Sequence, residues 1–390
     1  MIKAYWWFTS FIAPLVLSLA LSSTSAPAGS CPEDCSDPPT SRSPVNIYNQ
    51  TTADYLSPAT MGALPRVYVP NRSSNSVSVI DTATLKEVDR FTVGLKPQHV
   101  VPSWDLRTLW VANNASGTSK GSVTPIDPRT GKPGHEIPVD DPYNMYFMPD
   151  GSSAIIVDEA YERLDLRDPQ TMALKSVIPT PTCPGINHAD FSADNAYAIF
   201  TCEYGAGGLL KVDLKNQKVL GHLALSKMGM PQDIRLSRDG KVFYVADMMN
   251  DGVFLIDGDS FSEIGFIATG IGTHGFVVSR DGTRLYVSNR GSHKMEQGRA
   301  KGPGSVTVID FATRSVVAQW PIPGGGSPDM GNVSADGKQL WLSGRFDSEV
   351  YMIDTASGAV TKIRVGVEPH GLTVWPQPGR YSQGHTGNMR

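Results

Sequence analysis

Residues 275–289 read G-F-V-V-S-R-D-G-T-R-L-Y-V-S-N, and residues 234–247 read I-R-L-S-R-D-G-K-V-F-Y-V-A-D. Both stretches have the pattern of a β-strand, an S-x-D-G turn and a second β-strand. The Asp-Gly pair supplies the positive-φ positions that a tight hairpin needs. The same unit recurs, complete or degenerate, at Ser103, Phe147, Phe191, Val333 and Trp375. The chain is therefore built largely from one repeated strand-turn-strand unit.

A second marker, a β-branched strand ending in Asp, accompanies each hairpin. Its seven copies end at Asp81, Asp127, Asp168, Asp213, Asp257, Asp310 and Asp354, which are 41 to 53 residues apart. A period of about 40–45 residues that contains several short strands is typical of a β-propeller. The longest interval holds an inserted loop at residues 291–304. Seven markers predict an all-β fold, a seven-bladed β-propeller.

The two ends of the repeat are out of phase by part of a blade. The chain enters at a middle strand, Arg66 to Val69, and leaves after a lone inner strand, His370 to Val374. We expect this last strand to complete the first blade, which closes the ring without an unpaired edge. The predicted propeller spans residues 65–376. A flexible Pro/Ser-rich leader at 29–64 precedes it, and a polar tail at 377–390 either folds over one face or stays disordered.

Three segments carry a family resemblance: Leu285 to Asn289, Val67 to Asn71 and Trp110 to Asn114. They resemble the Y-V-T-N repeats of YVTN-type β-propellers, which include exported YncE-like proteins. The resemblance covers about residues 65–376 and implies the fold. It extends more loosely to 6-phosphogluconolactonase-like lactonases and to haem d1-binding propellers. Propellers have many unrelated activities, so the resemblance implies no particular one.

The first 28 residues have the pattern of a secretory signal peptide. Lys3 precedes an apolar stretch from Ala4 to Leu21, and small residues follow up to Ala28. A membrane anchor is the alternative, and Pro14 weakens it. Residues 28–31 also weakly resemble a lipobox, which would acylate Cys31. We expect a protein that is secreted, periplasmic or in the cell envelope, with no membrane span after cleavage.

Export makes the four cysteines informative, because an oxidising compartment permits disulfides. Cys31 and Cys35 could close only a small local loop, whereas Cys183 lies in a predicted turn and Cys202 in the following hairpin. We expect a Cys183–Cys202 disulfide, which would contribute about 3 kcal/mol by the chain-entropy argument. Neither pair has the two-residue spacing of a zinc knuckle.

Composition and motifs exclude some functions. The 390 residues include 34 Lys+Arg and 38 Asp+Glu, for a formal net charge of −4. A nucleic-acid partner is not expected, because binding to phosphates needs a basic face. The one G-x-S-x-G match, Gly117 to Gly121, lies in a Gly/Ser-rich turn between two predicted strands, whereas a nucleophile elbow joins a strand to a helix, so a hydrolase of that type is disfavoured. We expect a monomer.

The inner strands of a propeller line its central channel, so their first residues meet near one mouth. Five residues before each S-x-D serine stand Gln98, Tyr143, Asn187, Gln232, His274, Asp329 and His370. The next residues are His99, Asn144, His188, Asp233, Gly275, Met330 and Gly371. None of these is Lys, Arg, Leu, Ile or Val, which predicts a polar mouth. The strand pleat decides which row faces the channel, and the sequence leaves both rows open.

From these two rows we expect the ligand-binding residues to be Gln98, His99, Asn144, His188, Asp233, His274, Asp329 and His370. Neutral imidazoles beside carboxylates suit a divalent metal such as Zn or Cu, with Fe also possible. Only neighbouring blades could share an ion, so the expected metal ligands are His99, His274, Asp329 and His370. Two alternatives are structural hydration of a narrow channel and a tetrapyrrole with one axial His.

Two function classes remain open. The first is a binding or scaffold module that holds a small polar ligand at the mouth or a protein partner on a propeller face. The second is a metal-assisted enzyme at the mouth, such as a lactonase, another hydrolase or an isomerase. No residue is assigned a catalytic role, and the sequence favours the binding class.

Overall fold

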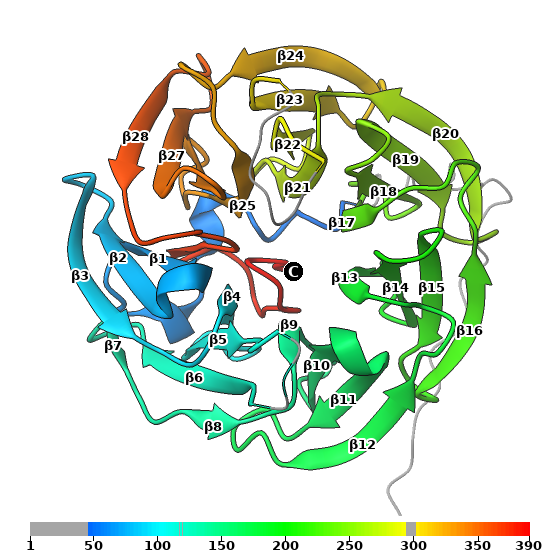
Figure 1. Ribbon diagram of the computed structural model, residues 1–390, viewed down its shortest axis with the longest axis horizontal. Coiled ribbons are helices and arrows are strands. Elements are labelled where there is room, and N and C mark those ends of the chain that lie inside the picture. Colours follow the sequence, from blue (N-terminus) through cyan, green and yellow to red (C-terminus); the bar gives the residue numbers. More distant parts are fainter. Residues whose placement is uncertain (1–45, 117, 119, 294–301) are drawn as a thin grey trace, which may run out of the picture. The chain divides into compact units, whose positions relative to one another are not determined.

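The repeated units fold into antiparallel sheets that surround a central channel as the blades of a β-propeller (Figure 1). The computed structural model describes residues 46–116, 118, 120–293 and 302–390. Within these ranges there are seven sheets, which confirms the predicted all-β, seven-bladed architecture. No helix in the same ranges is long and apolar enough to cross a membrane. The predicted signal peptide, Cys31 and Cys35 lie outside the described residues.

Each blade has an inner, a second, a third and an outer strand. The inner strands are β29 (Thr373–Trp375), β4 (Pro97–Pro102), β9 (Pro142–Phe147), β13 (Ile186–Phe191), β17 (Pro231–Leu236), β21 (Thr273–Val278) and β25 (Pro328–Val333). The second strands are β1 (Arg66–Asn71), β5 (Leu109–Asn113), β10 (Ala154–Asp158), β14 (Tyr197–Cys202), β18 (Val242–Asp247), β22 (Arg284–Asn289) and β26 (Gln339–Gly344).

The third and outer strands complete the blades. The third strands are β2 (Ser76–Asp81), β6 (Ser122–Asp127), β11 (Arg163–Arg167), β15 (Gly208–Asp213), β19 (Gly252–Asp257), β23 (Ser305–Asp310) and β27 (Glu349–Asp354). The outer strands are β3 (Lys86–Thr92), β7 (Lys132–Pro133), β8 (Ile137–Pro138), β12 (Leu174–Pro179), β16 (Lys218–Leu223), β20 (Ser262–Ala268), β24 (Ser315–Pro321) and β28 (Val360–Arg364). In the second blade β7 and β8 both pair with β6.

The ring closes as expected, with β29 beside β1. Val374 pairs with Val67 and Thr373 pairs with Tyr68, so the last strand completes the first blade. The strand is shorter at its start than the predicted His370 to Val374. The reason is that Gly371 pairs instead with the neighbouring blade: its amide donates to the Gln98 carbonyl and its carbonyl accepts from Val100, both at 2.9 Å.

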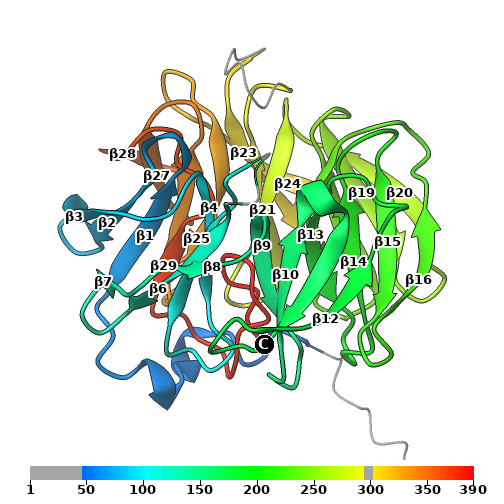
Figure 2. The same cartoon turned by 60° about the horizontal axis from the view of Figure 1, so that its bottom comes forward.

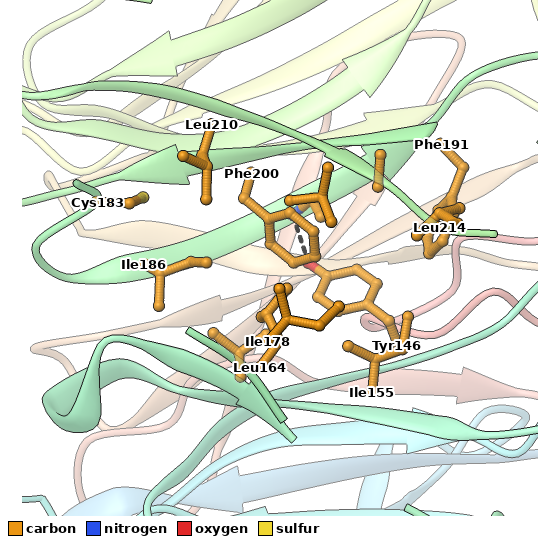
Figure 3. Close-up of a cluster of buried hydrophobic side chains, with 14 of the residues drawn as sticks. Tyr146, Ile155, Leu164, Ile178, Cys183, Ile186, Phe191, Phe200, Leu210 and Leu214 are labelled. Atoms are coloured by element: carbon orange, nitrogen blue, oxygen red, sulfur yellow. Dashed lines mark hydrogen bonds between the residues drawn. The ribbon is translucent and has the colours of Figure 1, made fainter. Parts of the chain in front are cut away.

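Apolar side chains from both faces of the blades fill the space between neighbouring sheets. Figure 3 shows one such cluster, between the blades of β9–β12 and β13–β16, in which Tyr146, Phe191 and Phe200 are fully buried. Burying each such side chain contributes about 1.5–3 kcal/mol. The predicted disulfide between Cys183 and Cys202 is confirmed, and both cysteines lie in this cluster.

Within the described part of the chain, four short 3₁₀ turns lie outside the sheets, and two of them precede the first blade. They are η1 (Ala53–Tyr55), η2 (Pro58–Thr60), η3 (Arg72–Ser74) and η4 (Glu159–Tyr161). The described part of the predicted leader, residues 46–64, contacts the ring through Tyr48. This side chain is 5% exposed, and its hydroxyl donates to the Leu236 carbonyl at 2.6 Å.

Residues 377–390, here called the tail segment, enter the central channel (Figures 1 and 2). Gln383 and His385 are fully buried, and the His385 amide donates to the Met145 carbonyl of β9 at 2.8 Å. We expected this segment either to fold over one face or to be disordered. It inserts into the central channel instead. The physical reason is polar complementarity, since the inner strands offer buried carboxylates such as Asp190 of β13, which accepts from Arg390 Nη2 at 2.9 Å.

Candidate functional site

Both predicted rows of inner-strand residues reach the channel, because each of the six longer inner strands contains a one-residue bulge. In β4, Pro97 pairs with Asn113 and His99 with Ala112, so Gln98 is the extra residue. The same shift occurs in β9, β13, β17, β21 and β25. A bulge interrupts the strict alternation of side chains. The sequence left open which of the two rows faces the channel, and the bulges allow both to do so.

All eight predicted ligand-binding residues are buried, at 4% exposure or less. The structure gathers most of them into two groups, in each of which one ligand atom per residue lies within 4.8 Å of the others. We call His274, Asp329 and His370 the upper group, and His188, Asp233 and His385 the lower group. His99 lies beside both, with ring centroids 4.7 Å from His370 and 5.4 Å from His385.

In the upper group, two imidazoles flank one carboxylate. His274 Nδ1 lies 2.8 Å from Asp329 Oδ1, and His370 Nε2 lies 3.5 Å from Asp329 Oδ2. His370 Nδ1 is 3.1 Å from the Gln98 carbonyl, which can only accept, so this nitrogen carries the proton. His370 Nε2 therefore presents a lone pair toward the carboxylate. Arg290 Nη2 donates to both Asp329 oxygens at 2.9 and 2.8 Å.

The electrostatics of the upper group favour the forms that ligate metals, which are neutral imidazole and ionised carboxylate. Burial, with the charge of Arg290 adding to it, lowers the pKa of His274 to about 4. Burial and the charge of Arg345 hold the pKa of His370 well below 6.5. Burial by itself would raise the pKa of Asp329, but Arg290 and His274 outweigh it and hold that pKa below its usual range.

His99 does not join the upper group, although the sequence placed it among the metal ligands. Its ring packs on His370 and on His188, with centroids 5.3 Å from the latter. Neither ring nitrogen has a hydrogen-bond partner among the described residues. Burial lowers the pKa of His99 to about 3, so the ring is neutral. Gly371 makes room for it, because a Cβ at that position would collide with the imidazole.

The lower group has a different hydrogen-bond pattern. His188 Nδ1 faces the Asn144 amide nitrogen at 3.0 Å, and the Asn144 oxygen is occupied by the Met145 amide. His385 Nδ1 faces Arg235 Nη2 at 3.1 Å. Both Nδ1 atoms must accept, so both protons are on Nε2. A ligating histidine normally donates from its second nitrogen, and this group therefore fits a structural network better than a metal.

Sequence reasoning missed His385, Arg235 and Arg290. His385 belongs to the tail segment, and only its insertion brings Nε2 within 3.4 Å of Asp233 Oδ1. Arg235 donates to Asp233 at 2.8 Å from the same inner strand. Burial raises the pKa of Asp233 to about 6 despite that guanidinium. A sequence signal existed only for Arg290, which follows the second strand of its blade directly, as Arg72 and Arg345 do.

Comparisons with known proteins support the fold. A family model described as YNCE-like β-propeller matches residues 45–378. Hydrazine synthase from Kuenenia stuttgartiensis is 19% identical, with a TM-score of 0.58 over 81% of this chain and 97% of that one. A protein from Bacteroides uniformis, provisionally assigned as a 6-phosphogluconolactonase, is 16% identical, with a TM-score of 0.61 over 79% and 98% of the two chains.

Dihydro-haem d1 dehydrogenase NirN, solved in complex with DHE, is 16% identical, with a TM-score of 0.59 over 79% of this chain and 75% of that one. No curated protein matches the sequence. At such low identities, the solved structures share the propeller fold with this chain, and the fold alone does not decide an activity.

Proposed function

The chain belongs to the YNCE-like β-propeller family, and we propose that it is an exported binding protein whose upper group holds a divalent transition metal. The ligands would be His274, Asp329 and His370. A set of two imidazoles and one carboxylate suits Zn or Cu better than Mg or Ca, which prefer oxygen.

The observation that supports this proposal is that two hydrogen-bond acceptors face each other with no proton to share between them. His370 Nε2 bears a lone pair, because its Nδ1 donates to the Gln98 carbonyl, and it faces the ionised Asp329 at 3.5 Å. A lone pair beside a carboxylate in a buried site is unfavourable unless a positive charge lies between them. A metal ion would supply that charge without protonating the ring.

Two of the three proposed ligands have outer contacts of the kind that orient metal ligands, whereas the second ring nitrogen of His274 has no hydrogen-bond partner among the described residues. The Gln98 carbonyl orients His370, and Asp329 is held by Arg290. His99 is the candidate for a further donor, since its ring packs on His370 and is neutral. Ligand atoms that bind one tetrahedral Zn at about 2.0–2.1 Å lie about 3.3 Å from one another. His370 Nε2 and Asp329 Oδ2 are already near that spacing at 3.5 Å, whereas His274 Nδ1 and Asp329 Oδ1, at 2.8 Å, would move apart on loading.

Export is part of the proposal. The Cys183–Cys202 disulfide supports it, because such bonds persist mainly in oxidising compartments. The predicted signal peptide at residues 1–28 is consistent with the same route. Mass spectrometry of the protein from the native host would test it: a mature chain that still begins at Met1 would argue against export.

The metal is tested by titration calorimetry with Zn and Cu on chelator-treated protein, alongside elemental analysis of the untreated protein. The variant is the double substitution His274→Gln, His370→Gln, and the matched control is His222→Gln at an exposed position. We expect the double variant to lose about 100-fold or more in affinity and the control to retain it. Equal affinity in all three proteins, or no binding in any, would overturn the proposal.

A further inference from the structure

In every blade, the residue that directly follows the second strand lies at the same end of the blade as the start of the inner strand. The register shows this, because Thr273 pairs with Asn289 and Pro328 pairs with Gly344. The residues at this position are Arg72, Asn114, Glu159, Glu203, Met248, Arg290 and Arg345. They therefore belong to the channel mouth that contains the upper group.

The charges at this position are segregated around the ring. Arg290, Arg345 and Arg72 belong to three consecutive blades, those of β21–β24, β25–β28 and β29 with β1–β3 (Figure 1). Glu159 and Glu203 belong to the neighbouring blades of β9–β12 and β13–β16. The mouth thus has a basic side and an acidic side, and low-dielectric walls strengthen the field between them.

The acidic side presents acceptor oxygens that receive no hydrogen bond from the described chain. Glu203 is 1% exposed, and one of its carboxylate oxygens accepts from the Asn187 side-chain amide at 2.5 Å. The Gln232 amide nitrogen donates to the Met230 carbonyl at 3.5 Å. These contacts fix both amide orientations, because a carboxylate and a carbonyl only accept. The remaining oxygens, Glu203 Oε1, Asn187 Oδ1 and Gln232 Oε1, have no hydrogen-bond partner in the described chain.

The basic side has an excess of positive charge. Two guanidinium groups share the one carboxylate of Glu368: Arg72 Nη1 donates to both of its oxygens at 3.1 Å, and Arg345 Nη2 lies 3.2 Å from Oε1. Arg345 Nη1 reaches only the Gln98 side chain, at 3.5 Å, and its Nε lacks a hydrogen-bond partner among the described residues. Arg345 is 3% exposed. A guanidinium with unused donors in a buried site suits a carboxylate or another oxyanion.

Ring contacts connect the two sides, because the Tyr143 ring, in the blade of Glu159, lies 6.5 Å from the His370 ring of the Arg72 blade. The charges of Arg290 and Arg345 oppose the rise in the pKa of Glu203 that burial causes. Charges on both sides affect the pKa of Tyr143: burial and the charge of Glu203 raise it, and the charge of Arg345 lowers it. The Tyr143 ring lies 5.5 Å from that of His99. The partly exposed Arg72 and Glu368 mark the solvent side of the mouth. Because Glu203 and Arg345 are both buried, a ligand that contacts both would be small.

We propose that this mouth binds a small zwitterion of the amino-carboxylate class, such as an α-amino acid. Its ammonium group would donate to Glu203, Asn187 and Gln232, and its carboxylate would accept from Arg345. An ammonium brings three donors and no acceptor, which is the complement of three unpartnered oxygens. This binding does not require a metal in the upper group, so it stands apart from the proposed function.

The test is a thermal-shift screen of the full chain in EDTA against individual L-amino acids, followed by titration calorimetry of each one that raises Tm. Every binder is compared on wild-type protein with its two half-ligands, the carboxylate that lacks the amino group and the amine that lacks the carboxylate. We expect each half-ligand to bind about tenfold or more weakly, since each loses one set of charged hydrogen bonds.

Two variants locate the site. Glu203→Gln and Arg345→Gln should each weaken binding of the amino acid by about tenfold or more. The exposed substitutions Glu136→Gln and Arg364→Gln should leave it unchanged. If no amino acid raises Tm, or if a half-ligand binds as tightly as the whole, the proposal is wrong. The half-ligand comparison needs no variant, so it remains decisive even if a buried substitution prevents folding.

Discussion

His274 Nδ1 lies 2.8 Å from Asp329 Oδ1, although the two residues belong to different, neighbouring blades. The same carboxylate accepts from Arg290, which follows the second strand of the His274 blade. Asp329 is fully buried and Arg290 is 1% exposed. One carboxylate thus joins two blades electrostatically, and its loss would affect both packing and ligand binding.

Asp329→Asn should therefore destabilise the protein strongly. Removing one partner of a buried ion pair leaves an uncompensated charge and typically costs about 3–5 kcal/mol. Urea unfolding followed by tryptophan fluorescence measures the change. The companion variant Asp329→Asn, Arg290→Met removes both charges and should recover part of the loss. An Asp329→Asn protein as stable as wild type would contradict the ion pair's role.

The disulfide gives a second prediction. Cys183 and Cys202 are separated by 19 residues, and a loop of that size constrains the unfolded chain by about 3 kcal/mol. Cys183→Ala, Cys202→Ala should lower the free energy of unfolding by about that amount, measured in urea without reductant. In the presence of reductant the wild-type value should approach that of the variant. If reductant leaves the wild-type stability unchanged, the bond does not form in solution.

Removing residues 383–390 should expose the lower group and leave Asp190 without its cation. The deletion takes away His385 and the Arg390 that donates to Asp190 at 2.9 Å. A buried carboxylate left without its cation costs about 3–5 kcal/mol. We expect a lower Tm and faster modification of His188 by diethyl pyrocarbonate, mapped by mass spectrometry. Unchanged Tm together with unchanged His188 reactivity would show that the tail segment does not occupy the channel in solution.

The buried carboxyl group of Asp158, outside the channel, should make the stability of the protein depend on pH. Burial and the charge of Asp165 raise the pKa of Asp158 to about 9, even though Arg163 Nε lies 2.7 Å away. The folded protein keeps this proton up to about pH 9, whereas the unfolded chain releases it above about pH 4. The resulting stability is present at low pH and is lost as pH rises through that window, by up to about 1.4 kcal/mol per unit.

Asp158→Asn cannot ionise, so it should be more stable than wild type at pH 8 and similar to it at pH 5. Urea unfolding at the two pH values measures the difference. Asp140→Asn is the matched control, because Asp140 also contacts Arg163 but its side chain is 47% exposed. A wild-type protein whose stability rises from pH 5 to pH 8 relative to Asp158→Asn would reverse the assigned sign.

The sequence predicted correctly what depends on local, repeated pattern. Strand alternation and the Asp-Gly turns specify one blade at a time, and their count specifies seven. The half-blade offset at Arg66 and Val374 predicted the closure of the ring. The even cysteine number predicted the Cys183–Cys202 bond. The same period also located the inner-strand residues, since equivalent positions in a closed ring converge on its axis.

What the tertiary structure alone decided depends on contacts between blades. The bulge at Gln98 and its equivalents, which turns two rows toward the channel, has no local sequence signature. The grouping of His274 with His370, and the separation of His99 from them, follow from side-chain packing at the axis. His385 reaches the site only because the tail segment enters the channel. Repeat patterns constrain each blade separately, whereas these distances arise only when all the blades have closed around one centre.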